Sequence, residues 1–414
     1  MRLSKRSGMS TMIAGIAIIV VLVVAGVAGY YLGVSSAPTS TTGVTSTVTT
    51  TLGAGATATV TATTTVTATG SASAGNSAPQ LSVLQADAVA AQKECGTQST
   101  CLTVYSTVDP GDWAADMAPS FYQAFPWANS KINWVGPSAA QVTSMAISEC
   151  QTNHVVGDLL VVTLGIVYPV INANCILDYN SPMAPLANAT VASGGADPNG
   201  AWYVSFVSIP VIQYNTAQMK ALNLPIPTQW SDLGNPVYKG HIAFQTATSL
   251  SATTGIFYNL YGQMGNSSWT TLMKAIAANQ PIITASASTT TGDITAGTAA
   301  LGIGLYNDYL AAIAAAPGSM GIVTPSPNVY NPGISAITKG SAHPAMAKLV
   351  EDWLMSNAGQ QGYAETARTP VNPQIAAIFN LVPPKTTLVN SYSNTTIFKN
   401  PTVWTTLFKN IFGA

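Results

Sequence analysis

Hydrophobic and polar residues follow three different patterns along this chain. Residues 12–34 form an uninterrupted apolar run, residues 35–79 are mostly small or β-branched residues, and from about residue 80 short β-branched runs alternate with helical patterns. Such alternation predicts an α/β protein, with parallel sheets covered by helices. This last part is too long for one simple core and long enough for two lobes.

One helix is especially clear from its spacing. Pro344 suits a first helical turn, and apolar residues then recur about every 3.6 positions. These residues are Met346, Leu349, Val350, Trp353 and Leu354. The pattern predicts a core helix over residues 343–354.

The N-terminal apolar run determines where the protein is expected to reside. Residues 1–11 carry Arg2, Lys5 and Arg6, and the 23 residues of the run that follows, 12–34, are enough to cross roughly 30 Å of hydrocarbon. We expect a transmembrane anchor, with the rest of the chain on the extracellular face. A cleaved signal peptide is the first alternative. A second is an archaeal pilin-type processing site at Lys5-Arg6-Ser7-Gly8, after which the apolar helix stays on the mature protein.

Residues 35–79 are predicted to form a stalk. They are rich in Thr and Ser, and no charged residue occurs between Arg6 and Asp87. Such a segment buries too little apolar area to offset its ordering entropy, and its many hydroxyls favour O-glycosylation. A spacer without sugars is the plain alternative. The alternating Thr and Val residues also permit β-pairing, which ranks below the stalk because nothing apolar covers the other face.

Four cysteines lie in the exported part, and their spacing is not that of metal ligands. Two disulfides are predicted, most locally Cys95–Cys101 and Cys150–Cys175, with three connectivities open. Three N-x-S/T sequons fit an exported surface. They begin at Asn188, Asn266 and Asn394.

Charged residues make up only 7% of the chain and the net charge is −1. A nucleic-acid partner is not expected, because it requires a basic face that neutralises phosphates. Few carboxylates are available for protonation, so we hypothesise an acidic, hot habitat with stability retained down to roughly pH 3. No Walker loop, G-x-S-x-G or H-E-x-x-H motif is present. The sequence therefore favours a binding protein without cofactor or metal over an enzyme.

An ordered series of segments between residues 202 and 245 carries a family resemblance. An apolar stretch ends in Tyr214-Asn215-Thr216, a short helical segment follows, and a Pro-rich turn leads to Trp230-Ser231-Asp232-Leu233, Tyr238-Lys239-Gly240 and a strand ending at Gln245. This order resembles the extracellular solute-binding proteins of ATP-driven (ABC) importers, in the two-lobed group that includes ferric-iron binders. Four further segments match the family in the same order along the chain, at 102–106, 157–162, 301–309 and 332–340. The resemblance therefore covers residues 98–375.

The resemblance implies a periplasmic-binding-protein type II fold with a ligand cleft between two lobes. The first lobe would comprise residues 80–205 and 324–375, and the second residues 206–323. Residues 376–414 would form a C-terminal helical extension that packs across the lobes or serves in docking. Hinge closure on a solute and delivery to a membrane permease are the implied function.

The resemblance also implies which positions meet the solute. Ser106, Thr107 and Asp109 follow the first strand, and Thr163 follows a later one, where iron-binding relatives place His and Glu. Tyr309 stands where those relatives carry two adjacent tyrosines, but here Leu310 follows it. Asn307, in the same segment, is expected to face the solute as well. One Tyr and one Asp fall short of the hard anionic ligands that ferric iron needs, so iron ranks below other solutes.

Hydroxyl-bearing and aromatic residues complete the predicted site. A loop with Ser249, Ser251 and Thr253 precedes an apolar helical run, whose N-terminus would suit an oxyanion or a sugar hydroxyl. Thr289 would face it, and Trp113 would stack on a sugar ring. The predicted ligand is a sugar, sugar phosphate, phosphonate or other oxyanion. The alternatives are a ferric-iron binder of the same fold and a pilin-like surface protein without ligand.

Overall fold

The computed structural model describes residues 43–52, 56–65, 75–186, 196–197, 199–246, 253, 255–384, 386, 388–390 and 401–413. These fall into two compact units, residues 1–73 and residues 74–414. Among the described residues, no helix combines the length and the apolar character that a membrane span requires. The predicted anchor, 12–34, lies outside the described residues.

The first unit contains a hairpin where we had expected a stalk without secondary structure. Strand β1 (Gly43–Leu52) pairs antiparallel with β2 (Ala56–Thr65), in a register that sets Val48 opposite Val60. The β-branched Thr and Val residues that alternate along both strands favour extended backbone. The β-pairing that ranked below the stalk is therefore the arrangement found over these two strands.

The larger sheet of the second unit has the strand order β13-β6-β12-β5-β3-β4, with β14 beside β12. Its strands are β3 (Leu102–Ser106), β4 (Ile132–Val135), β5 (Leu159–Thr163), β6 (Tyr203–Ser208), β12 (Asn328–Ile337), β13 (Thr369–Pro370) and β14 (Leu388–Asn390). Strand β3 lies parallel to β4 and β5, whereas β12 runs antiparallel to β5 and β6. The parallel part has its carboxyl ends at one edge.

The smaller sheet has the order β11-β7-β10-β8-β9. Its strands are β7 (Pro210–Asn215), β8 (Ile242–Gln245), β9 (Ile282–Thr284), β10 (Leu301–Leu305) and β11 (Met320–Val323). The chain leaves the larger sheet after Ser208, enters the smaller one at Pro210 and returns between Val323 and Asn328. The boundary predicted at 205/206 therefore falls inside β6, because the apolar run there holds two strands without a turn between them.

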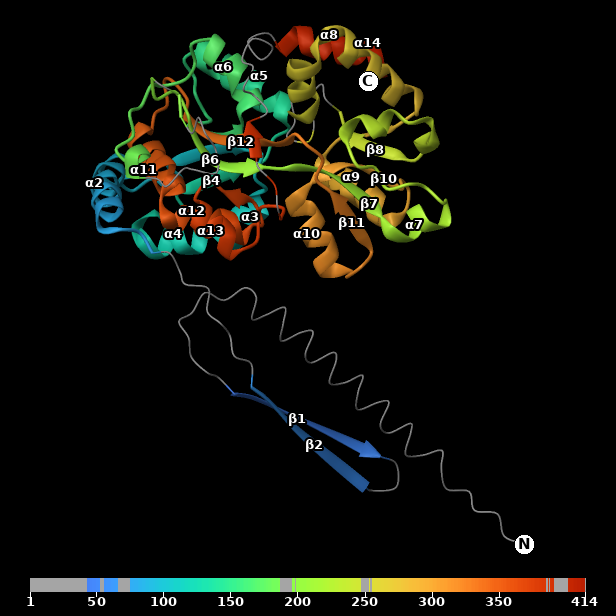
Figure 1. Cartoon of the computed structure of the whole chain (residues 1–414). Coiled ribbons are helices and arrows are strands. Elements are labelled where there is room, and N and C mark those ends of the chain that lie inside the picture. Colours follow the sequence, from blue (N-terminus) through green and yellow to red (C-terminus); the bar gives the residue numbers. More distant parts are fainter. Residues whose placement is uncertain are drawn as a thin grey trace. The chain divides into compact units, whose positions relative to one another are not determined.

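Helices cover both faces of each sheet (Figure 1). Around the larger sheet they are α2 (Ala78–Cys95), α3 (Pro110–Asp112), α4 (Ala118–Ala124), α5 (Ala139–Gln151), α6 (Leu164–Asn172), α11 (Pro344–Met355), α12 (Asn357–Glu365) and α13 (Pro373–Ile378). Around the smaller sheet they are α7 (Thr216–Ala221), α8 (Gly255–Ala278), α9 (Ala287–Ala296), α10 (Tyr306–Ala315) and α14 (Pro401–Phe412).

Strand β5 shows why the larger sheet needs both layers. All five of its residues are buried, with Leu160 and Val162 packed in the cluster that contains α5 and α6, and Leu159 and Val161 in the cluster that contains α2, α4 and α11. A strand buried on both faces is typical of a parallel sheet between two layers of helices. The predicted helix over 343–354 is α11, which begins at Pro344 after the N-cap His343.

The C-terminal segment is part of this fold. Besides α14 it contributes β14, so the region predicted as a helical extension also contains a strand. Trp404 and Phe408 of α14 are buried, and their rings contact Tyr258 and Phe257 of α8. The helix therefore covers α8, beside the smaller sheet.

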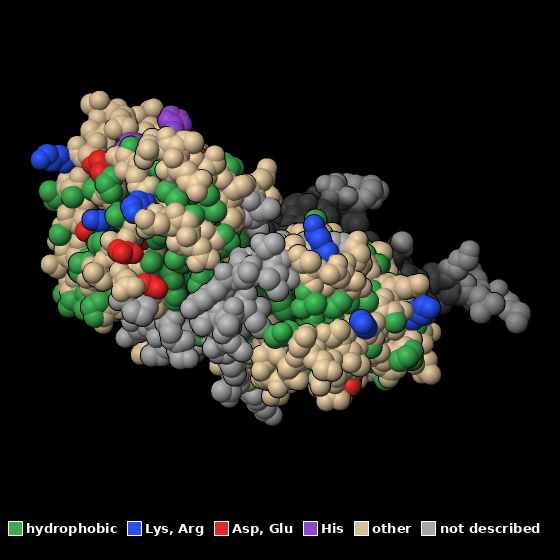
Figure 2. Space-filling model, turned by 90° about the horizontal axis from the view of Figure 1, so that it is seen from above, with side chains coloured by type: hydrophobic (Ala, Val, Ile, Leu, Met, Phe, Trp, Pro, Cys, Tyr) green, Lys and Arg blue, Asp and Glu red, His purple; other side chains and the backbone are tan. Residues whose placement is uncertain are grey.

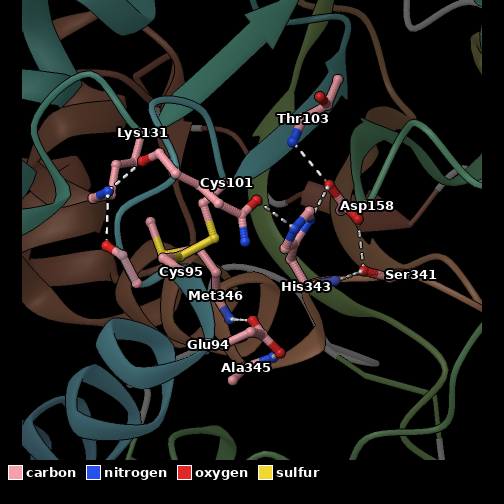
Figure 3. Close-up of a disulfide and its surroundings, with 12 residues drawn as sticks. Glu94, Cys95, Cys101, Thr103, Lys131, Asp158, Ser341, His343, Ala345 and Met346 are labelled. Carbon is pink, nitrogen blue, oxygen red and sulfur yellow. Dashed lines mark hydrogen bonds and ion pairs between the residues drawn. A yellow bond between two sulfur atoms is a disulfide. The ribbon is translucent and has the colours of Figure 1, made fainter.

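Both predicted disulfides are confirmed. Cys95 bonds to Cys101, with their Cα atoms 5.4 Å apart, and Cys150 bonds to Cys175, with 5.7 Å between the Cα atoms. Figure 3 shows the first disulfide between the end of α2 and the start of β3. Beside it, the carboxylate of Glu94 accepts hydrogen bonds from the backbone amides of Ala345 and Met346, at 3.1 and 2.9 Å, and so caps α11.

Candidate functional site

Most of the predicted site residues lie at the carboxyl ends of strands β3, β5, β8 and β10. Such ends are where open α/β sheets bind their ligands. Helices α6 and α10 begin directly after β5 and β10, and three residues separate the end of β3 from the start of α3. Helix N-termini offer unpaired amides and the positive end of the helix dipole. The fold therefore places several such helix starts where a solute would be expected.

Thr163 has the most distinctive environment of these residues. It ends β5, pairs with Gly333 of β12 and is the N-cap of α6. Only 6% of the residue is exposed, yet its hydroxyl makes no cap hydrogen bond and has no hydrogen-bond partner among the described residues. A buried hydroxyl without a partner costs about 1–3 kcal/mol. The unpaired Thr163 hydroxyl therefore destabilises the folded protein unless a further group hydrogen-bonds to it.

The start of α10 brings three further polar residues together. Its N-cap is Leu305, whose side chain cannot accept a hydrogen bond, so the first turn has no side-chain cap. The Asn307 amide donates to Oδ1 of Asp308 at 2.8 Å, and the Tyr309 ring stacks on Tyr306 with centroids 6.1 Å apart. Asn307 and Tyr309 are both partly exposed. They are thus accessible to a solute from this helix.

Charged side chains from both lobes lie close together near α10. This proximity could not be predicted from the sequence. Arg368, between α12 and β13, forms an ion pair with Asp112 of α3 at 2.6 Å. Burial raises the pKa of Asp308 to about 6. The nearby Arg368 guanidinium opposes this rise, whereas the Asp112 carboxylate adds to it. Oδ2 of Asp308 is buried without a hydrogen-bond partner among the described residues. Because Arg368 and Asp308 lie about 60 positions apart, only the folded chain shows their proximity.

The residues after β3 divide into structural and accessible ones. The Ser106 hydroxyl is buried, donates to the carbonyl of Val161 at 3.0 Å and accepts from the amide of Val108 at 2.8 Å. It therefore fixes the loop and faces no solute. Thr107 and Asp109 are exposed, and Asp109 caps α3 by accepting from the amide of Gly111 at 2.7 Å.

Trp113 is a core residue, contrary to the prediction that it stacks on a sugar. It is 4% exposed, and its ring lies parallel to that of Trp134, with centroids 4.4 Å apart, and edge-on to Trp353. Trp134 therefore occupies one face of the Trp113 ring, and the ring as a whole is buried. A turn just before a tryptophan predicts a loop, but it does not tell which way the ring points.

The remaining predicted hydroxyls have local partners. Thr253 is fully buried and donates to Oε1 of Gln245 at 3.0 Å, which ties it to the end of β8. Thr289 is exposed in the first turn of α9, with its hydroxyl 2.7 Å from that of the N-cap Ser286. Ser249 and Ser251 lie outside the described residues.

Comparison with known proteins agrees with this architecture. The model of the bacterial extracellular solute-binding proteins matches residues 159–390, more than half of the chain. The chain belongs to this family. The description of this family agrees with the predicted role in solute binding.

The relatives of this solute-binding protein are distant. A Haemophilus influenzae protein described as uncharacterized is 28% identical over 167 residues, which are 38% of this chain and 47% of that protein. The chain thus spans about half the length of this curated relative.

Solved structures share the fold of this solute-binding protein. The periplasmic binding protein AfuA from Actinobacillus pleuropneumoniae, with exogenous fructose-6-phosphate bound, has a TM-score of 0.61 at 19% identity and covers 75% of this chain and 96% of its own. Iron-bound HitA from Pseudomonas aeruginosa has a TM-score of 0.60 at 14% identity and covers 75% of this chain and 99% of its own.

The surface of this solute-binding protein carries few charges. On the face drawn in Figure 2, Lys, Arg, Asp and Glu side chains are scattered among hydrophobic and uncharged polar ones. Within the part of the chain that the structure describes, no three His, Cys, Asp or Glu residues are grouped so as to hold a metal ion. Asn266 is exposed, directly after Gly265, where the backbone of α8 is non-helical, and its glycosylation stays a prediction. Asn188 and Asn394 lie outside the described residues.

Proposed function

We propose that this protein captures a small polar or oxyanionic solute between its two lobes and delivers it to a membrane permease. The observation that carries the proposal is the buried hydroxyl of Thr163, which has no described hydrogen-bond partner at the uncapped start of α6. A solute oxygen would satisfy that hydroxyl and would also meet the positive end of the helix dipole. Asn307 and Tyr309 at the uncapped start of α10 supply donors from the second lobe.

The class of solute follows from the donors in this proposed site. Hydroxyls, amides and helix starts suit neutral sugars, sugar phosphates and phosphonates. The structural relative AfuA was solved with fructose-6-phosphate, which supports this class, whereas HitA was solved with iron. Tyr309 and Asp109 alone provide too few hard anionic ligands for a ferric ion. Iron therefore stays the second candidate.

A thermal-unfolding panel tests the proposal. We expect one sugar phosphate, phosphonate or sugar to raise the melting temperature of the full chain, because a ligand that binds only the folded state stabilises it. Thr163→Val should weaken the binding of that compound by about tenfold through loss of one hydrogen bond. The same variant should be at least as stable as the wild type without solute, because the hydroxyl it removes has no described partner.

The control is Thr152→Val, which removes an exposed hydroxyl bonded to the carbonyl of Ser148 at 2.8 Å. This control should bind the compound as the wild type does. Stabilisation by ferric citrate alone would favour the iron reading. A flat response to the whole panel would contradict solute capture and favour the surface-protein alternative.

The N-terminal segment is proposed to anchor the protein on the extracellular face of the membrane. Residues 12–34 are long and apolar enough for a span, and basic residues precede them. The protein should therefore stay with the membrane after extraction with alkaline carbonate. Release into the supernatant, together with a mature N-terminus beyond residue 34, would identify a cleaved signal peptide. Cleavage near Gly8 with membrane retention would identify pilin-type processing.

A further inference from the structure

Two consecutive residues of α11, in the larger lobe, have buried carboxyl groups. Glu351 and Asp352 of α11 are 1% and 0% exposed. Helix α2 packs against α11, and its half-buried Asp87 brings a third carboxyl group to Asp352. Buried carboxyl groups are normally paired with a cation or bound to a metal. This group of three therefore needs an explanation.

Hydrogen bonds to these carboxyl groups leave some oxygens without a donor. Asp352 accepts from the hydroxyl of Tyr179 at 2.8 Å on Oδ2 and from the hydroxyl of Ser181 on Oδ1. Oδ2 of Asp87 and Oε1 of Glu351 are buried and have no donor among the described residues. Two facing carboxyl oxygens form a hydrogen bond only when one of them carries a proton.

The surrounding charges cannot neutralise three carboxylates. Lys348 of α11 is the cation that acts on Asp87 and Glu351, and its Nζ lies 4.7 Å from the ring centroid of Tyr179. The other titratable groups that face the cluster are phenols, Tyr179 and Tyr203 of β6. Like charges in a buried cluster disfavour each other's ionisation. Fewer than three of these carboxyl groups are therefore ionised in the folded protein at neutral pH.

We propose that Asp87 and Asp352 share a proton beside a neutral Glu351, and that this protonated cluster locks α2 onto α11 in an acidic exterior. Rising pH removes the shared proton and leaves repelling carboxylates between the two helices. The Cys95–Cys101 disulfide and the cap that Glu94 gives to α11 hold the C-terminal end of α2 (Figure 3). Loosening is therefore expected in the part of α2 around Asp87.

The direction of the pH effect follows from the pKa values. Burial, and then the charge of Asp352, raise the pKa of Glu351 to about 8. Burial is also the main cause that raises the pKa values of Asp352 and Asp87. A carboxyl group with a raised pKa in the folded state stabilises the fold fully below its unfolded value, roughly 4, and loses this contribution as pH rises through the folded value. The folded protein should therefore lose stability between about pH 4 and pH 8.

Thermal unfolding of the full chain in mild detergent between pH 5 and pH 8 tests the lock. The wild-type melting temperature should fall across this range, with a clear further fall between pH 7 and pH 8. This last interval lies above the titration of Asp308, whose pKa is about 6. Glu351→Gln should make the fall between pH 7 and pH 8 smaller, since the amide stays neutral while the proton shared by Asp87 and Asp352 still titrates.

The matched control is Asp178→Asn, an exposed carboxyl next to Tyr179. The melting temperature of this variant should fall with pH as that of the wild type does. A wild-type melting temperature that is constant or rises from pH 5 to pH 8 would overturn the proposal. The proposal would also be overturned if the melting temperature of Glu351→Gln fell as steeply between pH 7 and pH 8 as that of the wild type.

Two measurements on the wild type keep the proposal testable if the variant does not fold. The infrared absorption of a protonated carboxyl group should persist at pH 7, and its absence would overturn the proposal. Hydrogen exchange, corrected for its intrinsic pH dependence, should become faster in α2 than in the sheet strands between pH 5 and pH 8. Equal change in both would contradict a lock between α2 and α11.

Discussion

Replacing Trp404 with Ala is expected to remove about 3–5 kcal/mol from the free energy of unfolding of the protein. Trp404 is 2% exposed and contacts three aromatic rings of α8, those of Tyr258, Tyr261 and Trp269, with centroids 4.5, 5.9 and 5.0 Å away. Its removal leaves a cavity at the contact that holds α14 on α8. Urea unfolding of the variant should show a lower midpoint.

A surface substitution on the same helix provides the control. Lys409 of α14 is exposed, so Lys409→Ala should change the free energy of unfolding by less than about 0.5 kcal/mol. Trp404→Phe should lie between the two variants, because it keeps an aromatic ring in the contact. A loss below about 1 kcal/mol in Trp404→Ala would contradict the packing of α14. It would revive the view that the C-terminal segment is a docking element.

Local patterns predicted the elements of the fold well. The helix α11 follows from Pro344 and the spacing of apolar residues after it, and the two disulfides join the cysteines that are nearest in sequence. The order of strands and short helices between residues 202 and 245 was enough to indicate the family. These features depend on neighbours in the chain, which the sequence displays directly.

Burial of individual side chains could not be predicted in the same way. Ser106 and Trp113 both sit near a loop after β3, yet one fixes that loop and the other packs on Trp134 in the core. A loop position predicts exposure only on average. The direction of each side chain depends on which helix covers it, and that is a property of the tertiary fold.

The buried carboxyl groups show the same limit more sharply. The spacing of apolar residues on α11 puts Glu351 and Asp352 outside its apolar stripe, which predicts exposure to solvent. Instead they are buried, with Asp87 of α2 and Tyr179 beside Asp352. The low overall charge led us to expect little electrostatic change with pH. That expectation rests on the number of charges alone. Burial shifts the pKa of a carboxyl group far more than exposure does, so a few buried carboxyl groups can dominate the pH dependence of stability.

Removal of the Cys150–Cys175 disulfide is expected to cost about 3–4 kcal/mol of stability, on the chain-entropy account. Its cysteines are 25 positions apart, against 6 for Cys95–Cys101, so it restricts the unfolded chain more. On that account, loss of the shorter loop should cost only about 2 kcal/mol. Double Cys→Ala variants of each pair, compared by urea unfolding, test this order without leaving a free thiol.

A larger loss of stability for Cys95–Cys101 than for Cys150–Cys175 would also be informative, because the two disulfides lie beside different contacts of the folded state. Cys95–Cys101 follows Glu94, whose carboxylate caps α11, so its loss can disturb a contact of the folded state. If its removal costs more than removal of Cys150–Cys175, native contacts outweigh chain entropy here. The excess should then shrink when Glu94→Gln is added, since that variant already lacks the charged cap. An unchanged excess would exclude the cap as its cause.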